Sequence, residues 1–117
     1  MRKVLLFIIL FVASNSYAAT EKEMIAQSLS GDYQSQRNLA YSYSKGWGKN
    51  GDGDYVPKNP IYSCAWRKVI LMANTKNADN VDYANESIDC KSVQPTDNQQ
   101  VWKIVFAILQ EISKKAH

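Results

Sequence analysis

The sequence predicts an all-α protein, a single small domain of about five helices. Apolar residues recur at helical spacing in several segments, and alternating β-branched runs typical of strands are few. Polar stretches with glycine or proline separate these segments. With 117 residues, the chain has room for one domain. We expect the stretch from Gly31 to Trp66 to be its centre, and the segments after it to be packing partners.

The first 18 residues have the layout of a secretory signal peptide. Arg2 and Lys3 form a basic start, and residues 4–13 are an unbroken apolar run. Ser16-Tyr17-Ala18 then places small residues at a cleavage site after Ala18. The apolar run is too short for a mature transmembrane helix, which needs roughly 20 residues; a buried N-terminal core helix is the alternative. We therefore expect a domain over 19–117, periplasmic or secreted, with no stable membrane insertion after cleavage.

Two helices are expected before the central loop. The first covers residues 20–29 and begins with a capping box formed by Thr20 and Glu23. The second ends at Lys45 and is capped by Asp32 or Ser35. Its expected core face consists of Leu39, Ala40 and Tyr43.

Residues 49–59 form a polar loop, because glycines, two aspartates and Pro57 exclude regular structure there. A calcium site is a weaker alternative, since no register of the loop matches the EF-hand ligand pattern. Asn59 and Pro60 are expected to cap a third helix that reaches Ala73. Because this helix is apolar on two sides, we place it at the centre of the bundle. One face would hold Ile61, Ala65, Val69 and Met72, and another Trp66, Ile70 and Ala73.

Two further helices are expected after residue 79. One begins at Asn80 or Asp82 and reaches about Lys91, with Val81, Ala84 and Ile88 on one stripe. Cys90 lies off that stripe, so either the helix loosens before Cys90 or Cys90 faces another neighbour. A capping box of Thr96 and Gln99 is expected to start the last helix. Its apolar stripe comprises Val101, Trp102, Val105, Phe106, Ile108, Leu109 and Ile112.

Cys64 and Cys90 are the two cysteines, and in an exported chain an even count predicts a disulfide. Closing a loop of this length would stabilise the fold by roughly 3–4 kcal/mol in the chain-entropy model. A structural zinc site is disfavoured, because it needs four Cys or His ligands and His117 is the single histidine.

Charge and motifs predict no cofactor and no nucleic-acid partner. Of the 14 basic residues, Arg2 and Lys3 lie in the expected signal peptide, so 12 remain against 11 acidic residues. No block of like charge is present. A single terminal histidine excludes the usual nucleophilic triads, and residues 48–54 lack the spacing of a phosphate loop. We therefore expect no catalytic residues, no cofactor-binding residues and no metal ligands.

The central stretch resembles one divergent Sel1-like repeat, a helical hairpin of the tetratricopeptide-like class, at about residues 31–73. The matching residues are Gly31-Asp32, Gln36, Leu39-Ala40, Tyr43, Gly46, Gly48 and Ala65-Trp66. Ala40 stands where the family usually has Gly, Ser35 replaces an Ala, and the insertion GDGDYV lengthens the loop. The resemblance covers under half of the expected domain. It implies a hairpin capped by flanking helices and an interaction role.

We therefore expect an exported helical-repeat protein, not an enzyme, that binds another protein. Arg37, Tyr41, Trp47 and Tyr55 are the candidate partner-binding residues, because aromatic and arginine side chains are enriched at binding hot spots. Packing of these aromatics against the flanking helices is the alternative, above all for Trp47.

Two other functions stay open. The first is an immunity or inhibitor protein that neutralises a toxin or a cell-wall-degrading enzyme, for which small size, export and a disulfide are suitable. The second is an enzyme accessory with carboxylate chemistry, which would need two carboxylates about 5–10 Å apart in a cleft. Its candidate acids are Asp32, Asp52, Asp54 and Glu86. A purely structural cell-envelope protein would lack an aromatic patch.

Overall fold

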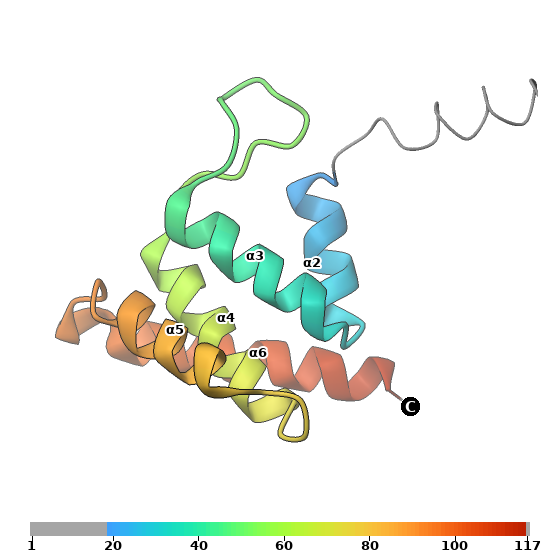
Figure 1. Cartoon of the computed structure of the whole chain (residues 1–117), viewed down its shortest axis with the longest axis vertical. Coiled ribbons are helices and arrows are strands. Elements are labelled where there is room, and N and C mark those ends of the chain that lie inside the picture. Colours follow the sequence, from blue (N-terminus) through green and yellow to red (C-terminus); the bar gives the residue numbers. More distant parts are fainter. Residues whose placement is uncertain (1–18, 117) are drawn as a thin grey trace, which may run out of the picture.

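The computed structural model describes residues 19–116. In that range the chain consists of helices joined by loops (Figure 1). The elements are α2 (Glu21–Leu29), α3 (Tyr33–Lys45), α4 (Pro60–Ala73), α5 (Asn80–Cys90), the 3-10 turn η1 (Pro95–Asp97) and α6 (Asn98–Lys115). An isolated antiparallel bridge pairs Trp47 with Val56. The predicted all-α class is confirmed. The predicted signal peptide lies outside the described residues.

Side-chain caps begin the first helices where the sequence predicts them. The Thr20 hydroxyl accepts a hydrogen bond from the Glu23 backbone N–H (3.1 Å), and the Glu23 carboxylate accepts one from the Thr20 N–H (2.9 Å). Asp32 caps α3 by accepting from the Ser35 N–H at 2.9 Å. Asn59 caps α4, with Pro60 at its first position. Each bond satisfies an N–H group that has no partner within its helix.

The predicted capping box of Thr96 and Gln99 is wrong. Pro95 begins the 3-10 turn η1, which places Thr96 inside a turn. Asp97 then precedes α6 with helical backbone angles (φ −95°, ψ −2°) and makes no side-chain cap bond. A capping side chain accepts from a backbone N–H two or three residues later, typically from an extended residue, and the turn removes that geometry.

Helix α4 is the centre of the bundle, as predicted, since it contacts α3, α5 and α6. It runs antiparallel to α3. The Asn59 N–H donates to the Tyr43 carbonyl at one end of the pair (2.8 Å), and the Asn74 amide donates to the Gln36 side chain at the other (2.8 Å). The buried apolar core consists of Leu39, Ala40, Tyr43, Val56, Cys64, Ala65, Trp66, Val69, Ile70, Val101 and Val105.

Small residues and one glycine shape the α3–α4 hairpin. Ala40 and Ala65 are fully buried, so the two helices approach closely at these positions. Gly46 ends α3 with a φ of +76°, a backbone conformation that other residues adopt at a cost. Trp66 fills the space beside Ala65, and it is 4% exposed. The predicted core face of α3 is therefore confirmed.

The predicted stripes of α4 and α6 are buried only in part. Val101 and Val105 are fully buried, whereas Phe106 is 55% exposed. Met72 is 46% exposed, so its assignment to the core face of α4 is wrong. Ala73 is exposed as well, so the side of the last turn that holds Met72 and Ala73 faces solvent, whereas Ile70 on the same turn is fully buried.

The apolar stripe of α5 was predicted to face the core. Instead, the opposite face of the helix packs against its neighbours. Val81 is 55% exposed and Ile88 is 60% exposed, and Ala84 between them is exposed too. The residues that face α3 and α4 are instead Asp82, Glu86, Asp89 and Cys90.

The predicted disulfide between Cys64 and Cys90 is present, with a Cα–Cα distance of 4.7 Å. Because α5 continues as far as Cys90, the helix does not loosen before the cysteine. Cys90 faces a different neighbour from Val81 and Ile88, namely α4. This outcome selects one of the two arrangements that the sequence leaves open.

Candidate protein-binding surface

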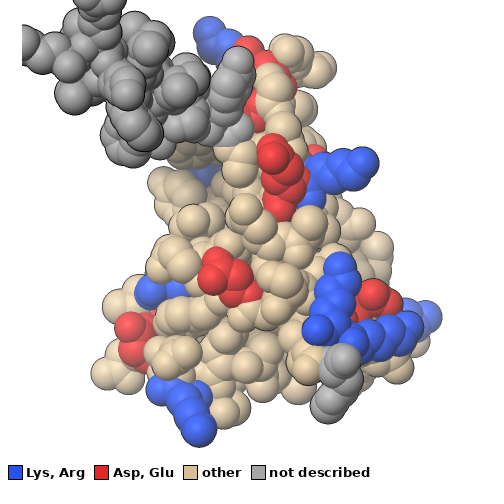
Figure 2. Space-filling view, turned by 90° about the vertical axis from the view of Figure 1, so that its right-hand side faces the viewer, with Lys and Arg blue, Asp and Glu red and all other residues tan. Residues whose placement is uncertain are grey.

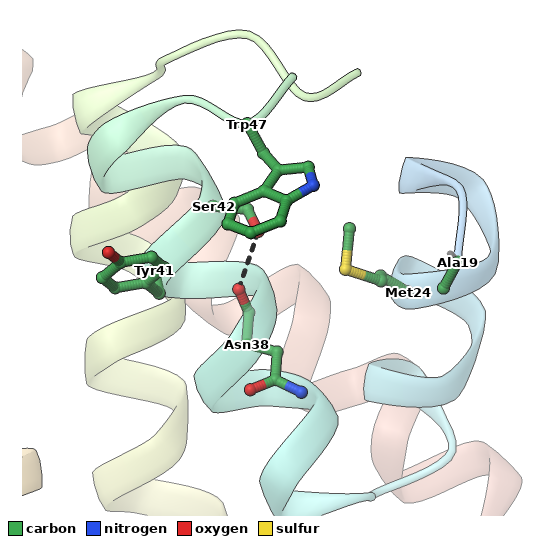
Figure 3. Close-up of a pocket in the computed structure, with 6 residues that line it drawn as sticks. All are labelled: Ala19, Met24, Asn38, Tyr41, Ser42 and Trp47. Carbon is green, nitrogen blue, oxygen red and sulfur yellow. Dashed lines mark hydrogen bonds between the residues drawn. The ribbon is translucent and has the colours of Figure 1, made fainter. Parts of the chain in front are cut away.

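An apolar groove lies between α2 and α3, below the loop that follows α3 (Figure 3). Its volume is about 280 Å³, and its lining consists of Ala19, Met24, Asn38, Tyr41, Ser42 and Trp47. Two of the four predicted binding residues, Tyr41 and Trp47, therefore line one groove. Figure 3 shows the Trp47 ring at the groove, whereas the Tyr41 ring points to the other side of α3 from Met24 and Ala19. None of the lining residues carries a charge, so the groove would hold an apolar group.

Trp47 is held in place at the rim of this groove. Its ring N–H donates to the Asp54 carboxylate at 3.0 Å, and its backbone pairs with Val56 through bonds of 2.9 and 2.8 Å. Gly48, with a φ of +71°, then turns the chain into the loop. The side chain is nevertheless 49% exposed, so Trp47 is not a core residue. Because the ring is already held in one orientation, contact with a binding partner would cost little side-chain entropy.

Tyr41 is 50% exposed on α3. Tyr55 lies elsewhere: it is half-buried in the loop and is not part of the groove lining. The loop is ordered by its own contacts, because Asp52 accepts from the Lys49 N–H at 3.0 Å. Asp52 and Asp54 thus each bind a donor of their own loop, which is the arrangement of a solvated turn.

Arg37 is separate from the groove, and its contacts are within the molecule. Its guanidinium donates to Asp82 at 3.0 Å, approaches Asp79 at 4.0 Å and lies 5.0 Å from the centre of the Tyr33 ring. The side chain keeps 26% of its exposure. A role for Arg37 and Tyr55 in binding stays a prediction.

Arg37 belongs to a polar layer between α5 and the α3–α4 pair, which sequence reasoning missed. We name Asp82, Glu86 and Asp89 the α5 carboxylates. Glu86 binds Lys68 at 2.7 Å. Asp89 binds Arg67 at 2.8 Å and accepts from the hydroxyls of Ser63 (3.0 Å) and Ser44 (3.1 Å). Asp82 binds Arg37 and also accepts from the Tyr33 hydroxyl and the Asp79 N–H.

A sequence signal for this layer exists. The α5 carboxylates recur at helical spacing on the side of α5 away from Val81 and Ile88. Arg67 and Lys68, which interrupt the apolar run of α4, are the matching cations. Because buried charges require partners, the interruption of an apolar helix by two cations predicts an acidic neighbour.

The electrostatics of Asp82 reflect this environment. Burial opposes ionisation of its carboxyl group, but hydrogen bonds from Tyr33 and the Asp79 N–H, together with the charge of Arg37, outweigh it and lower its pKa. The same hydrogen bond to a carboxylate raises the pKa of Tyr33 to about 12. At neutral pH, therefore, Asp82 is ionised and Tyr33 is its neutral donor.

A second apolar groove, of about 300 Å³, lies between α2, α4 and α6. It is lined by Ile25, Leu29, Tyr43, Tyr62, Trp66, Ile104, Ala107, Ile108 and Glu111. The hydroxyl of Tyr43 donates to Glu21 at 2.7 Å, and burial together with this bond raises the pKa of Tyr43. No residue of this groove was a sequence candidate for binding.

The four acids of the carboxylate alternative do not converge on either groove. Asp32 caps α3, Glu86 binds Lys68, and the two loop aspartates bind loop donors. None of the four lines a groove. On the face that Figure 2 presents, acidic and basic side chains lie in small groups, some of both signs and some of one, separated by uncharged surface.

Comparison with models of known protein families, with characterised proteins and with solved structures finds no match to this chain. Between residues 19 and 116, no helix has the length and apolar character to cross a membrane. In the same range, no three acidic, cysteine or histidine residues form a group able to hold a metal ion.

Proposed function

We propose that this protein is exported and acts by binding another protein through the groove of Tyr41 and Trp47. The observation that carries the proposal is the exposure of two aromatic side chains, each about half exposed, on an uncharged groove. Tryptophan and tyrosine dominate binding hot spots because they bury a large area with few rotatable bonds. Trp47 is already oriented by Asp54, which reduces the entropy lost on binding.

Export is the part of the proposal that rests on the N-terminal sequence and the disulfide. Disulfides persist in oxidising compartments and are rare in the bacterial cytosol. The Cys64–Cys90 bond is therefore consistent with a periplasmic or secreted protein.

We further propose that residues 31–73 are a divergent Sel1-like hairpin. Its support is the antiparallel α3–α4 pair followed by α5, which runs parallel to α3. The parallel direction follows from two contacts along the helices, Arg37 with Asp82 and Ser44 with Asp89. Stacked helical hairpins alternate in this way.

An inhibitor or immunity protein is the more specific form of this function. The loop of residues 48–58 projects from one end of the helices (Figure 1), and contacts within the loop and with Trp47 fix its shape. A projecting, pre-organised loop beside an apolar groove suits insertion into the cleft of a target enzyme. The target would be a toxin or a cell-wall-degrading enzyme.

The test is affinity capture from a periplasmic extract of the bacterium that encodes the protein, with wild type and four variants. Trp47→Ala and Tyr41→Ala alter the groove. Tyr83→Ala and Phe106→Ala are matched controls, because these side chains are 57% and 55% exposed and lie outside the groove. Loss of a hot-spot aromatic costs about 2 kcal/mol or more, which is roughly 30-fold in affinity.

We expect one stoichiometric partner that the controls retain and the two groove variants lose. Circular dichroism and melting temperature check that every variant is folded. A partner retained equally by all five proteins would contradict binding at this groove. If the captured partner is a hydrolase or toxin, its inhibition at a one-to-one ratio separates the inhibitor from a simple adaptor.

A further inference from the structure

Helix α5 is attached to the rest of the domain mainly by polar contacts and a disulfide. Of the hydrophobic residues in α5, Cys90 alone packs against the apolar core. Its apolar residues Val81 and Ile88 face solvent instead. The buried core therefore consists of side chains from α3, α4, α6 and the loop residue Val56, with α2 packed against it, and α5 reaches it through Cys90.

Two kinds of interaction hold α5 in place. The first is the covalent bond from Cys90 to Cys64 at its C-terminal end. The second is the α5 carboxylates with their partners, which are Tyr33, Arg37 and Ser44 on α3 and Ser63, Arg67 and Lys68 on α4. Asp79, at the start of α5, adds a backbone N–H to Asp82 and lies 4.0 Å from Arg37.

We infer that α5 is a releasable helix: when the disulfide is reduced and the α5 carboxylates are protonated, α5 leaves α3 and α4 while the other four helices stay folded. Neither change is sufficient alone. The ion pairs keep α5 in place in the reduced protein at neutral pH, and the disulfide keeps it in place in the oxidised protein at acidic pH.

The interactions between α5 and its neighbours weaken as the pH falls. Acid removes the negative charge of carboxylates but leaves guanidinium and ammonium groups charged. The raised pKa of Tyr33 keeps it a neutral donor throughout the acidic range. Asp82 has a lowered pKa in the folded protein, so the stability that it supplies is present above its unfolded pKa, near 4, and is lost as the pH falls through the folded value.

Reduction has a simple balance. A dithiol reductant donates two electrons and two protons, the bond between the Cys64 and Cys90 sulfurs breaks to give two thiols, and the dithiol becomes a disulfide. Release then uncovers Arg67, which is 5% exposed in the folded domain. Arg37, Arg67 and Lys68 would be left without their acidic partners.

Hydrogen exchange with mass spectrometry tests the inference under four conditions: oxidised and dithiothreitol-reduced protein, each at neutral pH and at about pH 2, below the ordinary pKa of every carboxyl group and low enough for the lowered pKa of Asp82. Rates are corrected for the intrinsic effect of pH. We expect that in the reduced acidic sample alone, protection of α5 amides falls at least ~100-fold relative to those of α4 and α6. Simultaneous loss of protection in all the helices would overturn the inference, as would an α5 that stays protected in that sample.

Variants make the result independent of the reductant. Cys64→Ser with Cys90→Ser reproduces the reduced state, and Asp89→Asn in that background removes one α5 carboxylate. We expect this triple variant to lose α5 protection by at least ~10-fold at neutral pH. The matched control is Glu111→Gln in the same background, because Glu111 pairs with Lys114 on α6, both side chains are exposed, and neither belongs to the polar layer. Equal protection of α5 in the two variants would overturn the role of the carboxylates.

Discussion

Replacing Arg67 by Met removes the cation from the most buried ion pair of the polar layer. The Arg67 side chain is 6% exposed, that of Asp89 is 10% exposed, and their closest atoms are 2.8 Å apart. Breaking such a pair leaves an uncompensated charge and costs about 3–5 kcal/mol. Asp89 keeps the hydroxyls of Ser63 and Ser44 as donors, so we expect the lower end, about 3 kcal/mol.

That loss is a large share of a stability of about 5–15 kcal/mol for a domain of this size. It corresponds to a fall of roughly 12–24 °C in melting temperature, at about 4–8 °C for each kcal/mol. The assay is urea denaturation of the oxidised protein, followed by circular dichroism. An unchanged dependence of unfolding free energy on urea would show that the native state is otherwise intact.

Two comparisons isolate the pair. Lys114→Met removes a lysine whose side chain is 72% exposed, and it should cost less than about 0.5 kcal/mol. Arg67→Met combined with Asp89→Asn should cost at least about 1.5 kcal/mol less than the sum of the two single changes. A cost below about 1 kcal/mol for Arg67→Met alone would refute the view that this pair is buried and structural.

Three further predictions follow from single contacts. Cys64→Ser with Cys90→Ser should lower the free energy of unfolding by about 3–4 kcal/mol, and an unchanged melting temperature under oxidising conditions would show that the thiols do not pair. Asp82→Asn should flatten the fall in stability between about pH 5 and pH 2, because the wild-type carboxylate with its lowered pKa contributes stability that disappears as it is protonated; parallel pH profiles of the two proteins would contradict this. Gly46→Ala should cost about 1–2 kcal/mol, measured by thermal denaturation, because Gly46 has a φ of +76°; a neutral result would mean that the turn relaxes.

The local elements of this fold could be predicted from short stretches of sequence. Thr20, Asp32 and Asn59 are capping residues, and their effect depends on backbone N–H groups within three positions along the chain. The central position of α4 could be predicted as well, because a helix that is apolar on two sides needs neighbours on two sides. With two cysteines in the chain, a disulfide had a single possible intramolecular pairing.

The candidate site could be predicted in part. Tyr41 and Trp47 were identified from their residue types, and the structure places both at one groove. The groove itself depends on Met24 and Ala19 of the preceding segment, which no pattern in residues 31–73 could indicate. Arg37 has the composition of a hot-spot residue, but its contacts with Asp82 and Tyr33 can be seen only when α5 is in place.

The orientation of α5 was decided by tertiary contacts, which the apolar pattern of α5 itself does not indicate. Its sequence is amphipathic, and an amphipathic helix by itself favours burying Val81 and Ile88. Arg37, Arg67 and Lys68 lie up to 45 residues earlier in the chain and meet the opposite face of α5, where the bond from Cys64 also fixes Cys90. Pairing three buried or half-buried charges outweighs the burial of two aliphatic side chains, because a buried charge without a partner costs more than an exposed apolar group.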